Sequence, residues 1–192
     1  MKQMIAPVIA VFALSLLLGG CTATRSTSFI HPEFDFGVVE RAAIIPFENL
    51  STEQGTASYV TRVFMTELLA SGAFDVVEPG EVTRVIGTVG PVRAAEMPLA
   101  QIKRTGADLG VQALIFGSVG ESAPLRGSTG QSAHAISIDV RMVDTENGAT
   151  VWSAVVNTGG PGLFGRLFGT GEQSRSAAVR KAVRKAISTL VK

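Results

Sequence analysis

The sequence predicts an α/β (α+β) two-layer sandwich, in which helices pack on a mixed β-sheet and an amphipathic helix closes the chain. Three observations support this prediction. A short apolar run suits a strand at 41–47, apolar and polar residues alternate over 136–142, and an apolar stripe with helical spacing lies near the end of the chain. Together with the segments between them, they predict the element order β, α, β, α, α, β, β, β, α.

The first half of the predicted domain contains two strands and three helices. The run 41–47 suits a buried strand, because it is apolar after its first residue and loop-forming residues follow it. Residues 56–71 have the spacing of one buried helical face, and Gly72 is a natural stop for that helix. The apolar residues of this face are Val60, Val63, Phe64 and Leu68. The other elements predicted here are a strand at 74–77 and helices at 80–88 and 98–104.

Three strands and one helix are predicted for the second half. A central strand is expected at 111–119, and residues 120–132 are expected to form a loop rich in glycine, serine and proline. Strands at 136–142 and 150–156 are joined by a hairpin loop with Asn147-Gly148 at its turn. The last helix has an apolar stripe opposite a basic face. It spans 174–190, with Val179, Val183, Ala186, Ile187 and Leu190 in the stripe and Arg175, Arg180, Lys181, Arg184 and Lys185 on the basic face.

The N-terminus has the three parts of an exported bacterial lipoprotein precursor. Lys2 supplies the only charge, an apolar run too short for a membrane span follows, and small residues lead to Cys21. The segment 18–21, Leu-Gly-Gly-Cys, is similar to a lipobox. This resemblance implies a signal peptide at 1–20 and a mature chain that begins with an acylated, palmitate-bearing Cys21. The alternative is an ordinary secretory signal beside a coincidental cysteine.

The mature chain is predicted to consist of a lipid anchor, a short tether and one domain. Residues 21–32 are the lipidated cysteine and a flexible tether rich in serine and threonine, and residues 33–192 form a single α/β domain. The eleven residues of the tether reach at most about 40 Å, so the domain stays near its membrane. Thr22, rather than an aspartate, follows the cysteine. In Gram-negative lipoproteins this implies the outer membrane, on its periplasmic face.

The charge balance argues against nucleic acid as a partner. Removal of residues 1–20 takes away Lys2 and no acid, so 17 Lys and Arg become 16, against 16 Asp and Glu. A formally neutral mature chain lacks the positive charge that binding to a phosphate backbone requires.

The sequence shows no constellation typical of an enzyme, a metal site or a cofactor site. His31 and His134 lack metal-ligand spacing, the one cysteine is predicted to be acylated, and no serine lies in a nucleophile-elbow motif. The segment 160–165 matches a dinucleotide-binding pattern, but no second strand with a distant acid follows it. We therefore predict no catalytic residue, metal or cofactor. The alternative is an envelope hydrolase with an unrecognised site.

Two segments are candidate contact surfaces. Two leucines and two phenylalanines lie among glycines where a solvated loop would be polar, so they pack under the sheet of their own domain or contact a neighbouring subunit or the outer-membrane interface. The basic face of the last helix is either solvated or in contact with lipid headgroups or another anionic polymer. The loop residues are Leu163, Phe164, Leu167 and Phe168, and the basic residues are Arg180, Lys181, Arg184 and Lys185.

Four stretches, in the expected order, resemble the domain shared by CsgG-like proteins, LpoB and the TolB N-terminal domain, a superfamily of bacterial envelope proteins. They are the opening strand and loop 42–51, the second strand 72–79, the helix end and third strand 106–119, and the closing hairpin 140–153. The resemblance implies an envelope lipoprotein that works by binding protein partners, or copies of itself, and not by catalysis.

Two departures from this superfamily narrow the functional prediction. CsgG builds a pore from two long hairpins per subunit, and a membrane-spanning hairpin needs about 20 residues or more. The corresponding stretches here, 120–135 and 157–173, are too short and lack alternating apolar faces. LpoB-like activators use a long disordered tether, which this chain lacks. The prediction is therefore a non-enzymatic, outer-membrane-anchored periplasmic lipoprotein that is a scaffold or accessory subunit in secretion or surface-structure assembly. The alternative is an LpoB-like regulator of a peptidoglycan synthase, a penicillin-binding protein.

Overall fold

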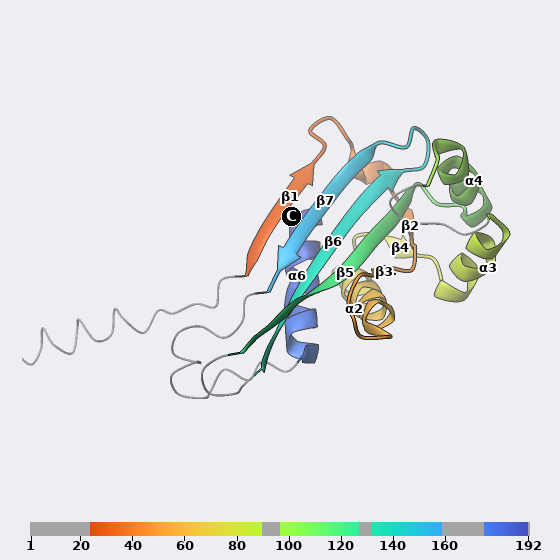
Figure 1. Cartoon of the computed structure of the whole chain (residues 1–192). Coiled ribbons are helices and arrows are strands. Elements are labelled where there is room, and N and C mark those ends of the chain that lie inside the picture. Colours follow the sequence, from red (N-terminus) through yellow and green to blue (C-terminus); the bar gives the residue numbers. More distant parts are fainter. Residues whose placement is uncertain (1–23, 90–96, 127–131, 159–174, 192) are drawn as a thin grey trace, which may run out of the picture.

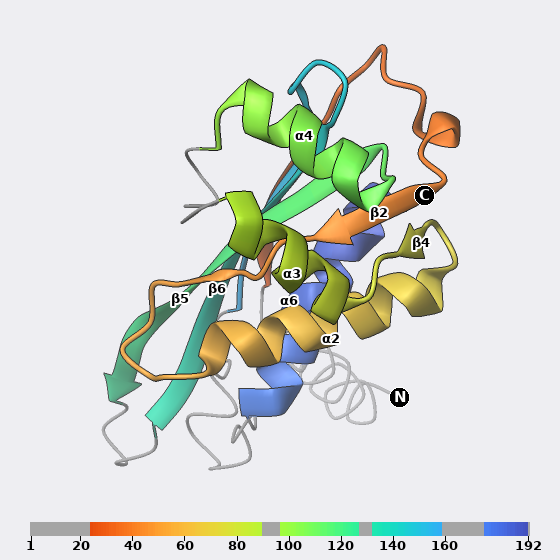
Figure 2. The same cartoon turned by 90° about the vertical axis from the view of Figure 1, so that its right-hand side faces the viewer.

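A mixed β-sheet with helices on both faces is the framework of the molecule (Figures 1 and 2). The computed structural model describes residues 24–89, 97–126, 132–158 and 175–191. The strands are β1 Arg25–Ile30, β2 Arg41–Ile44, β3 Glu48–Asn49, β4 Asp75–Val76, β5 Ala113–Arg126, β6 Ser132–Asp144 and β7 Thr150–Asn157. The helices are α2 Thr56–Ser71, α3 Pro79–Val89, α4 Leu99–Leu109 and α6 Arg175–Leu190, with a short 3-10 helix, η1, at Phe36–Val38.

The sheet combines a parallel part with an antiparallel part. Its seven strands follow the order β1-β7-β6-β5-β2-β4, and β3 also pairs with β5. Strand β2 is parallel to β4 and β5, whereas β5, β6, β7 and β1 are antiparallel neighbours. The predicted α+β class, with helices packed on a mixed sheet, is confirmed.

The main core lies between the sheet and the helices α2 and α6. The predicted alternation on β6 is confirmed, because Ile136, Ile138, Val140 and Met142 are all buried in this core. The apolar stripe of α6 packs against them, and its predicted members are all buried. Trp152 of β7 is also fully buried, and its Nε1 donates a hydrogen bond to Thr189 Oγ1 of α6 at 3.1 Å. The sequence periodicity therefore identified the buried faces correctly.

A second core lies on the opposite face of the sheet, where α3 and α4 cover β2 and β5 (Figure 2). Leu114 and Phe116 of β5 are buried there against apolar side chains of both helices. Among the described residues, no helix covers the rest of this face, over β6, β7 and β1. We call this the open face; it exposes Phe29 and Val155. Every helix in the described ranges is too short or too polar to span a membrane.

Strand β1 corrects the predicted tether. Residues 22–32 were expected to be flexible, but Arg25–Ile30 forms an edge strand that pairs with β7 over its whole length. All six side chains are exposed, so the strand has no buried face and no hydrophobic period that could reveal it. Backbone hydrogen bonds to a strand more than 120 residues later in the chain hold it instead.

A second correction concerns residues 120–132, which were expected to form a loop. Strand β5 runs to Arg126 and β6 begins at Ser132, so much of this stretch belongs to a long hairpin. The ladder shifts register between Ser122 and Leu125, where Pro124 cannot donate a backbone hydrogen bond. The glycine, serine and proline content indicated a loop, but the register shift lets the hairpin continue past the proline.

Smaller differences affect element boundaries. The strand predicted at 41–47 ends at Ile44, before Pro46, and the loop expected after it contains the short strand β3. Helix α4 continues to Leu109, five residues beyond its predicted end, and Gly110 stops it in the left-handed conformation at φ 62°. The predicted stop of α2 at Gly72 is confirmed, with φ 66°.

A close contact between β5 and Phe47 gives the first testable prediction. A Cβ atom on Gly117 would lie 2.9 Å from two ring atoms of Phe47, which itself packs edge-on against Phe64. Gly117→Ala should therefore lower the free energy of unfolding by about 1–3 kcal/mol, the usual effect of overpacking. Gly120→Ala is the matched control, because its new Cβ would meet only Ser137 Cβ at 3.9 Å. Urea titrations in which the control lost more stability would contradict this packing.

Candidate functional site

Two arginines of α6 fasten this helix to α2. Near the start of α6, Arg175 contacts Glu53, three residues before α2, and Thr56, the first residue of α2. Further along, Arg184 Nε donates to both carboxylate oxygens of Glu67, at 2.9 and 3.0 Å. This hydrogen bond and the negative charge of Glu67 raise the pKa of Arg184 above its ordinary value. The two arginines thus connect α6 with α2 and with the segment just before it, at the edge of the main core.

The four residues of the predicted basic face lie on α6, and one of them, Arg184, has Glu67 as a structural partner. Arg180 and Lys185 are exposed and Lys181 is partly buried, whereas Arg184 is paired with Glu67. The helical spacing placed these residues on one side because the opposite side is the buried stripe. Contact of this face with lipid headgroups or another anionic polymer stays a prediction.

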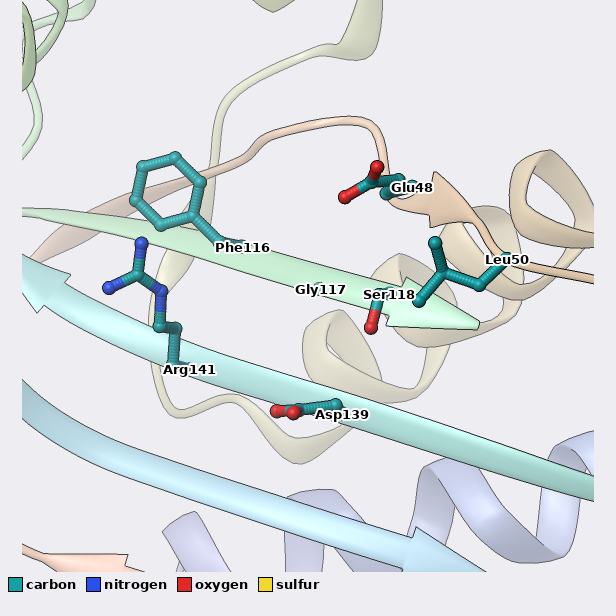
Figure 3. Close-up of a pocket in the computed structure, with 7 residues that line it drawn as sticks. All are labelled: Glu48, Leu50, Phe116, Gly117, Ser118, Asp139 and Arg141. Atoms are coloured by element: carbon teal, nitrogen blue, oxygen red, sulfur yellow. The ribbon is translucent and has the colours of Figure 1, made fainter. Parts of the chain in front are cut away.

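A shallow hollow of about 210 Å³ lies on the open face, where β3, β5 and β6 meet (Figure 3). At one end the Arg141 guanidinium carbon lies 5.0 Å from the centre of the Phe116 ring, a cation–π contact. Asp139 lies further along β6 in Figure 3. The hollow is lined by Glu48, Leu50, Phe116, Gly117, Ser118, Asp139 and Arg141.

The chemistry of this hollow suits binding. Leu50 is 63% exposed and offers an apolar contact beside the charged groups. Two carboxylates and one guanidinium supply ionic and hydrogen-bonding partners around it. The hydroxyl of Ser118 has no histidine or lysine among the lining residues that could activate it as a nucleophile.

The sequence indicates only part of this hollow. The alternation over 136–142 places Asp139 and Arg141 on the same face, but it does not indicate a hollow beside them. Glu48 and Leu50 enter from a segment about 90 residues earlier, because β3 pairs with Ser118 and Val119 of β5. That parallel pairing has no local sequence signal.

Several predicted site residues lie outside the described residues. These are Cys21 and the loop residues Leu163, Phe164, Leu167 and Phe168, for which the predictions stand as made. His31 is partly buried and its Nδ1 accepts a hydrogen bond from the backbone N–H of Glu33 at 3.3 Å. In the part of the chain that the structure describes, no group of three histidine, cysteine or acidic side chains could hold a metal ion.

The chain has no match among family models or, by sequence, among characterised proteins. Its fold does match solved structures. A PelC dodecamer from Paraburkholderia phytofirmans has a TM-score of 0.60 and 17% identity, and the match covers 88% of this chain and 99% of that chain. Lipoprotein GNA1162 from Neisseria meningitidis has a TM-score of 0.54 and 16% identity, covering 78% of this chain and 95% of that chain. LpoB from E. coli reaches a TM-score of 0.48 at 13% identity, covering 64% of this chain and 59% of that chain.

The first two matches show that this chain shares its fold with PelC and with a bacterial lipoprotein over almost the whole of their lengths. At these identities the likeness concerns the fold, and the assignment to the CsgG-like superfamily stays a prediction.

Proposed function

We propose that this chain is an outer-membrane-anchored periplasmic lipoprotein that works without catalysis, as a scaffold or accessory subunit of an oligomeric secretion or surface-structure assembly. One observation carries the proposal: the fold extends over 88% of this chain onto PelC, a protein solved as a dodecamer. The lipobox-like segment before Cys21 and the fold shared with lipoprotein GNA1162 support the anchored state. Membership of the CsgG-like superfamily is part of the same proposal.

The surfaces of the domain support a role in assembly. The open face combines exposed apolar residues, Phe29 and Val155, with a hollow that offers charged and apolar contacts but no activated nucleophile. The edge strand β1 leaves one side of its backbone without a partner among the described residues. Such edges pair readily with a strand of another chain. These are features of a protein that binds other chains.

The alternative role, regulation of a peptidoglycan synthase in the manner of LpoB, is less well supported. Such a regulator needs a long tether to cross the peptidoglycan layer. Because β1 begins at Arg25, only residues 22–24 separate Cys21 from the folded sheet. A domain held so closely to its anchor reaches partners at its own membrane.

The oligomeric state tests the proposal directly. The lipidated chain, extracted from envelopes in mild detergent, should give a homo-oligomer in native mass spectrometry that survives dilution to micromolar concentration. A Cys21→Ser chain expressed without residues 1–20 separates assembly by the domain from clustering by lipid. A strictly monomeric domain under both conditions would contradict an oligomeric scaffold.

Partner identification separates the two proposed roles. Crosslinking in intact envelopes, followed by purification of the lipidated chain, should recover components of a secretion or surface-structure assembly. Recovery of a penicillin-binding protein in place of these would favour the regulator and contradict the scaffold.

A further inference from the structure

Strand β1 shortens the connection between the lipid and the folded domain. The predicted tether had eleven residues after Cys21, but the sheet begins at Arg25. Four Cα–Cα steps join Cys21 to Arg25, so the anchor lies at most about 14 Å from the start of β1. The lipid surface is therefore close to one particular end of the sheet.

The hairpin of β5 and β6 extends beyond the sheet at this same end (Figure 1). Arg25 of β1 pairs with Asn157 of β7, and Asn157 pairs with Ser137 of β6, so these three residues lie at the same level of the sheet. From that level, β6 extends back to Ser132 and its pairing with β5 continues to Arg126. Five further residues of strand add about 17 Å. The hairpin thus projects at least as far as the anchor can reach.

The distribution of charge favours the same orientation. Exposed Arg25 lies at the anchor end of the sheet, where a cation suits anionic headgroups. Acidic side chains gather at the opposite end, around the end of β1, the starts of β2 and β4 and the β6–β7 turn. They are Glu33, Asp35, Glu40, Asp75, Asp144 and Glu146. They outnumber the basic residues at this end, which are Arg41 of β2 and Lys103 and Arg104 of α4, so an anionic bilayer repels it.

We infer that the domain is seated directly on the lipid bilayer, with the described end of the β5–β6 hairpin, up to Arg126 and Ser132, toward the headgroups and the acidic end pointing away. This end of the sheet contacts a lipid surface, because the three residues between Cys21 and Arg25 are too few to let the domain move away from the membrane. The described part of β6 that projects beyond the level of Arg25, Ser132 to Ile136, is shorter than the about 9–11 residues of a membrane-spanning strand, so it contacts the surface. The inference rests on the proposed lipidation of Cys21.

The test attaches the lipid chemically, so that it does not depend on acylation in the cell. Cys21 is the only cysteine, and a maleimide-bearing phospholipid can be coupled to it in the mature chain. The coupled protein is placed on vesicles of phosphatidylethanolamine and phosphatidylglycerol. The photo-crosslinking residue p-benzoylphenylalanine replaces Leu125 in the hairpin or, as the matched control, Leu99 of α4. Leu99 is 46% exposed and lies beside Gly148 in the turn at the far end of the sheet.

The expected result is severalfold more lipid crosslinked from position 125 than from position 99. Insertion of twenty Gly/Ser residues between Thr24 and Arg25, a linker with an r.m.s. span of about 25 Å, should reduce this ratio severalfold, because the domain is then released from the surface. Equal crosslinking from both positions, or more from position 99, would overturn the orientation. Mass spectrometry of Cys21 from cell-made protein tests lipidation separately, so that the two claims can fail independently.

Discussion

The variant Cys21→Ser should accumulate as an uncleaved precursor that contains no palmitate. The predicted anchor depends on one sulfur atom, because acylation of the Cys21 thiol normally precedes cleavage in the lipoprotein pathway and a serine hydroxyl does not replace it. Metabolic labelling with a palmitate analogue, together with the mass of the purified chain, measures both effects. The expected loss of labelling is complete.

A neighbouring substitution controls for general damage to export. Thr22→Ser also places a serine at the cleavage site but keeps the thiol, so it should be cleaved and labelled normally. Normal maturation of the Cys21→Ser chain would show that the N-terminus is an ordinary secretory signal. The short connection to β1 would then have no membrane at its end.

Replacement of Phe116 by alanine should have the largest effect on stability. Phe116 is 1% exposed, lies in the core formed with α3 and α4, and has the Arg141 guanidinium over its ring. Removing a buried aromatic ring costs about 3–5 kcal/mol, because transfer energy is lost and a cavity remains. Chemical denaturation of the mature domain at neutral pH measures this change.

Phe29→Ala is the matched control for this experiment. The same atoms are removed on the same face of the sheet, but Phe29 is 46% exposed on the edge strand. The free energy of unfolding should therefore fall by about 1 kcal/mol or less. A larger loss for Phe29 than for Phe116 would mean that the open face is covered in solution and that α3 and α4 contribute little to the core.

The candidate surfaces combine residues that lie far apart in the chain. Helical spacing placed the basic residues of α6 on one side, since the opposite side is a continuous apolar stripe. It did not show that Arg184 belongs to a pair, because Glu67 is 117 residues away in the chain. The hollow beside Arg141 was missed for the same reason: β3 supplies Glu48 and Leu50 through a parallel pairing between distant segments.

Elements that bury one face are predictable from local sequence. In the strand at 136–142 and in α6, one face is removed from water and is therefore apolar. Apolar residues recur along the chain with the period of the strand or helix, and this periodicity is visible in the sequence. The tertiary structure alone decided the course of β1 and the length of the β5–β6 hairpin. These segments are ordered by backbone hydrogen bonds to distant strands, and the peptide groups that form such bonds are the same in nearly every residue. Local composition therefore indicated a tether and a loop where pairing makes an edge strand and a projecting hairpin.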